Sequence, residues 1–269
     1  RNYTAQVSMS SPTAGAQPLR RRLQNPYSKL PDWFYPANVV FWYVLFALYG
    51  LVVSLLDTRP AHFLSYLSPF NSPEFLINIG PLHIPPGLWI GPIPLAFRLT
   101  CYYYRKAYYR GFLQHPSSCA HNEPARGTYR GETRFWIWNN LHRYAMYLTV
   151  AQVVVLWYDT VHAFVITPSG GFWTWAGTLH FGLGNVLMIV NVLCLSGYTF
   201  GCHAFRHWVG GGKDCQSCIR TRHRIWKGVT VLNVNHGVWA WTSMFTVWGT
   251  DLYIRLLSHG WLIPHGICN

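Results

Sequence analysis

Charged residues are scarce in this sequence of 269 residues. Lys, Arg, Asp and Glu make up 11% of the chain, whereas soluble domains usually carry about 25%. Long stretches have no charge at all, which excludes a disordered chain, a nucleic-acid-binding domain and almost any water-soluble enzyme of this length. What the chain has instead is 51% hydrophobic and 17% aromatic residues. We therefore predict a multi-pass protein of the cell membrane that contacts lipid and does not bind nucleic acid.

Acidic residues are the scarcest charged type, with 8 Asp and Glu against 21 Lys and Arg. None of them falls at the centre of a predicted span, although a proton-driven transporter or pump normally needs a carboxylate at membrane depth. No carboxylate pair suggests general acid–base catalysis, so hydrolysis is not expected either. The first 29 residues are polar and basic, so we expect no cleavable signal peptide.

The apolar stretches predict an all-α fold, a bundle of five transmembrane helices, because a bilayer core about 30 Å thick needs roughly 20 apolar residues per helix. The predicted spans are Val39–Leu56, Leu88–Tyr104, Phe135–Ile166, Phe172–Phe200 and Val229–Leu257. The second span is the least regular because it contains Pro92, Pro94 and Arg98. Together they form one membrane domain, residues 31–269, preceded by a basic polar tail, residues 1–30.

The distribution of Lys and Arg predicts the orientation of the bundle. Basic residues gather in the tail, in the loop 105–134 and in the loop 201–228, whereas Arg59 and Arg255 are alone on the other side. The N-terminus is therefore expected in the cytoplasm and the C-terminus outside. The outer segment 57–87 contains many Pro and Gly residues, and we expect it to lie along the outer interface as a lid.

Cysteine and histidine side chains gather in the two cytoplasmic loops and predict a metal site there. The segment 201–218, GCHAFRHWVGGGKDCQSC, combines a CxxC pair with two histidines one helical turn apart, and the segment 115–121, HPSSCAH, adds another cysteine. Thiols on the cytoplasmic side stay reduced, which favours metal or redox chemistry. The candidate ligands are Cys119, Cys202, His203, His207, Cys215 and Cys218.

This ligand set suits two kinds of centre. Zinc would take four ligands, for instance three of the cysteines and one histidine. A [2Fe–2S] cluster with two cysteines on one iron and two histidines on the other would be of the Rieske type. The soluble Rieske pattern, C-x-H followed by C-x-x-H, is absent as such.

Two further sets of side chains suggest redox cofactors. Histidines within the spans could ligate haem b, with His162 and His180 toward the outer side and His236 nearer the inner side, where only His142 is a plausible partner. Aromatic and basic residues at the inner headgroup level could instead form a quinone pocket, although they also suit interfacial anchors. The quinone candidates are Tyr103, Trp136, His142, Arg143 and Tyr144.

In its five spans and its inner Cys/His segments 115–121 and 202–218, the chain resembles the single-chain membrane anchor of actinobacterial succinate dehydrogenase (complex II). It is most similar to the kind of anchor that carries a Rieske-type [2Fe–2S] cluster. The resemblance implies a flavoprotein subunit that oxidises succinate and an iron–sulfur subunit that docks on the basic cytoplasmic face. Electrons would then pass through the cluster to menaquinone, and the whole complex could be an oligomer.

Three other functions remain as alternatives. A di-haem anchor would use the membrane histidines and leave the cysteines unexplained. A membrane di-iron desaturase or hydroxylase would use His203 and His207 as one histidine box, but such enzymes need several boxes and this chain has no His-His pair. A zinc-stabilised scaffold or transporter would have no redox activity.

Overall fold

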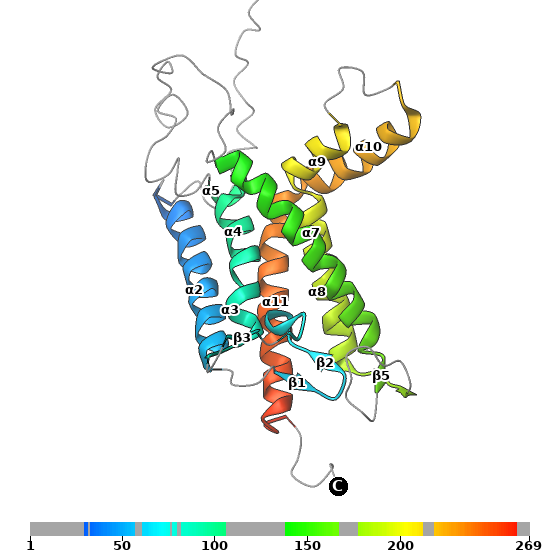
Figure 1. Ribbon diagram of the computed structural model, residues 1–269. Helices are drawn as coiled ribbons and strands as arrows, with labels where there is room; N and C mark the ends of the chain where they lie inside the picture. Colours follow the sequence, from blue (N-terminus) through cyan, green and yellow to red (C-terminus); the bar gives the residue numbers. More distant parts are fainter. Residues whose placement is uncertain are drawn as a thin grey trace, which may run out of the picture.

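The computed structural model describes residues 30–31, 33–56, 61–75, 77–79, 82–105, 138–166, 177–211 and 218–262. Within them, long helices run side by side (Figure 1). The four longest are α2 (Phe34–Leu56), α7 (Trp138–His162), α8 (Leu183–Phe200) and α11 (His236–Ser258). Helix α11 packs against α8, and α7 packs against both α4 and α8.

Of the shorter elements, α3, α4 and α5 follow one another along the bundle, whereas the others lie at its two ends (Figure 1). One end, which we call the α9–α10 end, carries two helices that lean away from the bundle. The other, the hairpin end, carries three two-stranded antiparallel hairpins. The shorter elements are β1 (His62–Phe63), β2 (Tyr66–Leu67), η2 (Pro69–Asn71), β3 (Ile77–Ile79), β4 (Leu82–Ile84), α3 (Pro86–Ile90), α4 (Pro92–Thr100), α5 (Tyr102–Arg105), β5 (Val165–Ile166), β6 (Thr178–Leu179), α9 (His203–Gly210) and α10 (Arg220–Val234).

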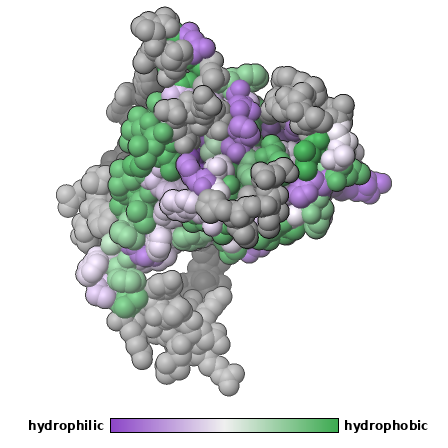
Figure 2. Space-filling view, turned by 90° about the horizontal axis from the view of Figure 1, so that it is seen from below, coloured by the Kyte–Doolittle hydropathy of each residue, from purple (hydrophilic) through white to green (hydrophobic). Residues whose placement is uncertain are grey.

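Large apolar side chains face outward along the helices as well as inward. The exposed fraction is 61% for Leu55, 62% for Val154 and 50% for Leu193. Seen from the hairpin end, hydrophobic residues cover much of the visible surface of the described part (Figure 2). By length and composition, α2 and α8 are apolar enough to cross a membrane. Such an outer surface suits a helical bundle surrounded by lipid.

The predicted second span is built from three consecutive helices instead of one. Helix α3 ends at Ile90, and α4 starts with Pro92 in its first turn, where the missing N–H of proline costs nothing. A second break falls at Cys101, whose extended backbone (φ −59°, ψ 132°) separates α4 from α5. The break turns the Cys101 side chain into the bundle, where it is 2% exposed.

The fourth and fifth spans also differ from their predicted limits. The described part of the fourth becomes helical only at Leu183, because Gly182 is extended (φ −148°, ψ −176°). The fifth is divided at Asn235, where the basic helix α10 ends and α11 begins. His236 therefore opens a helix at the α9–α10 end, whereas the sequence placed it inside a span.

The segment predicted as a lid lies at the hairpin end, and buried carboxylates hold it there. Asp251 of α11 is 0% exposed. It accepts hydrogen bonds from the hydroxyls of Tyr49 and Ser68 and forms an ion pair with Arg255 at 2.8 Å. Ser72 likewise donates to Asp159 of α7. Residues 65–72 are thus tied to α7 and α11 through side chains rather than through a sheet.

Replacing Asp251 with Ala should destabilise the folded bundle by about 3–5 kcal/mol, because Arg255 then stays partly buried without its counter-charge. Ser68→Ala is the control and should cost only about 1.5–3 kcal/mol, since it removes one hydrogen bond to the carboxylate and one from the Phe70 N–H but leaves no charge without its counter-charge. Thermal unfolding of the purified complex in one detergent would compare them. Equal melting temperatures for Asp251→Ala and the unaltered protein would contradict this role.

Candidate functional site

Two cysteines and two histidines meet at the α9–α10 end of the bundle. We call Cys101, His142, Cys202 and His236 the cysteine–histidine site. Three of them stand where a helix begins or ends: Cys101 between α4 and α5, Cys202 before α9, and His236 at the start of α11. Breaks in the helical backbone free these side chains from the helix faces, so that residues of four different helical segments converge.

The site consists of two thiol–imidazole contacts. The Nε2 atom of His142 lies 2.8 Å from the Sγ atom of Cys202, and Nε2 of His236 lies 3.4 Å from Sγ of Cys101. The exposed fractions of Cys101, Cys202 and His142 are 2%, 1% and 6%. Cys101 and Cys202 belong to the same packed core, together with Phe97, Tyr198 and the residues around them.

Aromatic rings and one hydroxyl orient the two imidazoles. The ring of Phe97 stacks on His142 with centroids 4.6 Å apart, and Tyr198 stacks on His236 at 4.9 Å. Thr100 donates its hydroxyl proton to the carbonyl oxygen of Ala96 at 2.7 Å, so its oxygen is left to accept from Nδ1 of His142 at 3.1 Å. His142 therefore carries its proton on Nδ1, and the lone pair of Nε2 points toward the Cys202 sulfur.

One buried polar atom beside these rings, Nδ1 of His236, has no hydrogen-bond partner in the described part of the chain. Buried polar groups without partners are rare and costly in folded proteins. The side chains of the site therefore do not satisfy all of its polar atoms.

A buried cation completes this end of the bundle. Arg98 of α4 is 2% exposed, and its guanidinium donates to the Tyr104 hydroxyl at 2.9 Å, the Ala240 carbonyl at 3.0 Å and the Ser243 hydroxyl at 2.8 Å. Its Cζ atom lies 4.6 Å from the centre of the Tyr198 ring. Arg98 thus lies between the cysteine–histidine site and the middle of the bundle.

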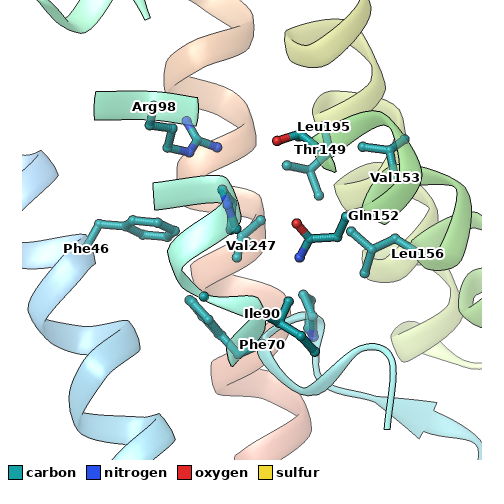
Figure 3. Close-up of a pocket in the computed structure, with 13 residues that line it drawn as sticks. Phe46, Phe70, Ile90, Arg98, Thr149, Gln152, Val153, Leu156, Leu195 and Val247 are labelled. Atoms are coloured by element: carbon teal, nitrogen blue, oxygen red, sulfur yellow. The ribbon is translucent and has the colours of Figure 1, made fainter. Parts of the chain in front are cut away.

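An apolar cavity lies on the other side of Arg98 (Figure 3). Its volume is about 510 Å³, including space open to the outside, and its walls come from α2, α3, α4, α7, α8, α11 and η2. The polar groups in its lining are Arg98, Thr149 and Gln152. The amide of Gln152 points from α7 toward the cavity (Figure 3), and its buried Oε1 atom has no partner among the described residues.

The structure does not bring the predicted metal ligands together at one place. Cys202 enters the cysteine–histidine site, whereas His203 and His207 lie one turn apart on α9 with exposed rings 5.3 Å from each other. Burial lowers the pKa of His203, and His207 and Arg206 lower this pKa further. Cys218 is disulfide-bonded, unlike the free thiol that the sequence suggested. Cys119 and Cys215 lie outside the described residues.

The predicted quinone and haem residues are also spread over different places. His142 turns inward, its neighbours Arg143 and Tyr144 are exposed, and the Tyr103 hydroxyl accepts from Nε1 of Trp241 at 2.8 Å. Trp136 lies outside the described residues. Of the haem candidates, His236 is at the α9–α10 end. His162 and His180 lie toward the hairpin end, where Nε2 of His180 is 2.9 Å from the Tyr66 hydroxyl.

No three His, Cys, Asp or Glu side chains in the described segments are arranged around one point as the ligands of a single metal ion. A binuclear cluster needs a different arrangement, with two sulfurs on one iron and two nitrogens on the other. The two separate Cys–His contacts match that donor set in type and in number.

The comparisons with known proteins identify the family. A family model described as actinobacterial succinate dehydrogenase subunit SdhC matches residues 34–260. The chain belongs to this family. The predicted relationship to the succinate dehydrogenase anchors is therefore confirmed, and this SdhC-family chain is a mostly helical membrane subunit of a succinate dehydrogenase complex, alongside other subunits.

A solved structure supports the same assignment for this SdhC-family subunit. The chain is similar to one from the Mycobacterium smegmatis Sdh1 complex in the apo form, with 36% identity and a TM-score of 0.69. The match covers 86% of this chain and 90% of that chain. No curated protein matches the chain.

Sequence reasoning did not single out Cys101 as a ligand of this anchor, and it assigned His142 and His236 to other cofactors. The useful signal was available: His142 had been named as the plausible partner of His236 at similar depth. What the sequence did not reveal is that helix breaks at Cys101, Cys202 and Asn235 bring their neighbours to one point.

Packing of α8 on α11 positions Tyr198 over His236, and Gly197 permits the close approach. A Cβ atom at Gly197 would lie 2.6 Å from the Trp239 ring, so Gly197→Ala should cost about 1–3 kcal/mol by overpacking. Gly249→Ala in α11 is the matched control, because nothing lies within 4 Å of its added Cβ. Thermal melting of both variants checks this, and an equal stability of the two would contradict it.

Proposed function

We propose that this anchor passes electrons from an iron–sulfur subunit of succinate dehydrogenase through a Rieske-type [2Fe–2S] cluster to menaquinone. The observation that carries the proposal is the buried pairing of Cys101 with His236 and of Cys202 with His142. Two thiols and two imidazoles are the Rieske donor set. A flavoprotein subunit would oxidise succinate to fumarate and supply the two electrons and two protons that the reduction of one quinone to quinol consumes.

The residues fit this cofactor by chemistry as well as by number. A bound [2Fe–2S] cluster would accept and donate one electron at a time. Thr100 holds the proton of His142 on Nδ1 and leaves Nε2 as a ligand, which is the usual role of a hydrogen-bond partner beyond a metal-binding histidine. Phe97 and Tyr198 keep both imidazole rings in place and exclude water from the site.

The charge distribution supports the orientation predicted for the anchor. We propose that α2, α3–α4, α7, α8 and α11 cross the membrane, with α9 and α10 on the cytoplasmic side. Arg206 and most of the first two turns of α10 are basic, whereas Arg255 at the hairpin end is paired with Asp251. A basic cytoplasmic end attracts an acidic partner and anionic lipid. The cysteine–histidine site would then lie on the side where the iron–sulfur subunit docks.

The apolar cavity is the place that we propose for the quinone ring. Its walls are mostly apolar with a few polar groups, the pattern typical of small-molecule sites, and the side-chain amide of Gln152 could donate to a quinone carbonyl. Arg98 borders both this cavity and the cysteine–histidine site, so an electron would travel only a short distance. The inner-interface pocket around Tyr103 is the alternative, and mutation distinguishes the two.

Electron paramagnetic resonance of the dithionite-reduced complex tests the proposed cluster. We expect a rhombic Rieske-type signal that Cys202→Ser or His236→Ala abolishes. Cys194→Ser should keep the signal, because Cys194 is a free, half-buried cysteine of α8 outside the site. Loss of the signal in Cys215→Ser or Cys218→Ser, with retention in Cys202→Ser, would assign the cluster to the CxxC pair instead and contradict the proposed site. Ferric haem features without a Rieske signal would favour the di-haem anchor.

Replacing Gln152 with Leu should raise the KM for a soluble menaquinone analogue about tenfold, the effect of one lost hydrogen bond of roughly 1.4 kcal/mol. The EPR signal should not change. Val154→Ala, on the exposed face of the same helix, is the control and should leave the KM as it is. An unchanged KM in Gln152→Leu together with a raised KM in Tyr103→Phe would assign the quinone to the inner interface.

A further inference from the structure

We propose that Arg98 raises the reduction potential of the iron–sulfur cluster by stabilising the negative charge that the cluster gains on reduction. The inference rests on the proposed function, because it needs a cluster between Cys101, His142, Cys202 and His236. It assigns to Arg98 a positioning and electrostatic role. The residue is not a ligand.

The Arg98 guanidinium has no counter-ion among the described residues. All three hydrogen-bond acceptors of Arg98 are neutral groups, namely two hydroxyls and one backbone carbonyl. No Asp or Glu in the described part of the chain forms an ion pair with it; the ion pair there is Arg255 with Asp251. A buried cation without a counter-charge is costly, and a charged residue at membrane depth is usually functional.

Ring contacts lower this cost without neutralising the charge. The Cζ atom of Arg98 lies 4.6 Å from the ring centre of Tyr198, 5.6 Å from that of Phe46 and 5.9 Å from that of Tyr104. Cation–π contacts and neutral hydrogen bonds stabilise the guanidinium, but the positive charge remains. The bundle therefore holds a fixed positive charge that no carboxylate of the described residues neutralises.

The positive charge of Arg98 lies beside the cysteine–histidine site. Arg98 precedes Cys101 by one turn, and the N–H of Cys101 donates to the Arg98 carbonyl at 3.2 Å. Tyr198 connects the two places, because its ring contacts the Arg98 guanidinium and also stacks on His236. The positive charge of Arg98 therefore lies near both Cys–His pairs of the cysteine–histidine site.

Reduction would change the net charge of a cluster bound at this site. Two cysteine thiolates neutralise an oxidised [2Fe–2S] core, and one added electron leaves the reduced cluster with a net negative charge. A fixed cation nearby stabilises the reduced state more than the oxidised state, and burial strengthens this effect because water does not screen it. Arg98 thus favours electron arrival from the iron–sulfur subunit, and it is itself stabilised when the electron is present.

The test is an EPR-monitored redox titration of the whole complex after its quinone has been extracted. For Arg98→Gln, we expect the equilibrium constant for reduction of the cluster to fall at least tenfold, which corresponds to about 59 mV for one electron. The line shape should stay of the Rieske type. Arg98→Lys should stay close to the unaltered potential, because it keeps the charge although it loses part of the hydrogen bonding.

A matched control distinguishes the effect of a buried positive charge on the reduction potential from the effect of an exposed one. Arg143 follows the proposed ligand His142 in sequence but is exposed, so water should screen it and Arg143→Gln should shift the potential much less. If Arg98→Gln fails to assemble, Ser243→Asp offers a second route. Its carboxylate would stand where the Ser243 hydroxyl accepts from Arg98 at 2.8 Å, and it should lower the potential by neutralising the guanidinium.

The outcomes keep the two proposals apart. No Rieske-type signal in the unaltered complex would overturn the proposed function itself. A signal with the same potential in the unaltered complex, Arg98→Gln and Ser243→Asp would overturn the role of Arg98 alone. An unchanged potential with a raised KM for the quinone analogue would likewise overturn it, since Arg98 would then act only as part of the cavity wall.

Discussion

The exclusion of water from the bundle is the constraint on which the rest of this structure depends. A polar side chain inside it must find its partner on another helix, because no solvent is available and an unpaired buried group costs free energy. Asp251 meets this requirement with Tyr49, Ser68 and Arg255, and the result ties the lid to the helices. Polar pairing in this interior therefore fixes which helices and loops meet, which apolar packing alone could not do.

The two ends of the bundle meet the same constraint in different ways. At the hairpin end, carboxylates are matched by hydroxyls and by a cation. At the α9–α10 end, the polar groups are not fully matched: Arg98 has no carboxylate partner among the described residues, and Nδ1 of His236 has no hydrogen bond. Such incomplete pairing is expected where a protein binds something, and it coincides with the cysteine–histidine site, where we propose the cluster.

Much of the architecture could be predicted because composition acts locally. Runs of apolar residues predicted where the long helices lie, although not where several of them begin, and the Pro and Gly residues of the segment 57–87 predicted an irregular cover. The breaks at Cys101 and Asn235 could not be predicted, since neither follows from a proline or glycine at that position. Both depend on what the neighbouring helices offer: Cys101 is buried against α7, α8 and α11, and the basic helix α10 turns away from the bundle.

The sequence by itself determined that this chain is a mostly helical membrane protein, because scarce charge and apolar runs are properties of the chain, and its resemblance to the succinate dehydrogenase anchors pointed to the family. Tertiary structure alone decided which thiol meets which imidazole. Cys202 and His142 are 60 residues apart, and Cys101 and His236 are 135 residues apart. The CxxC and HxxxH patterns drew attention to neighbours in sequence, whereas the buried contacts join helices that only the packing of the bundle brings together.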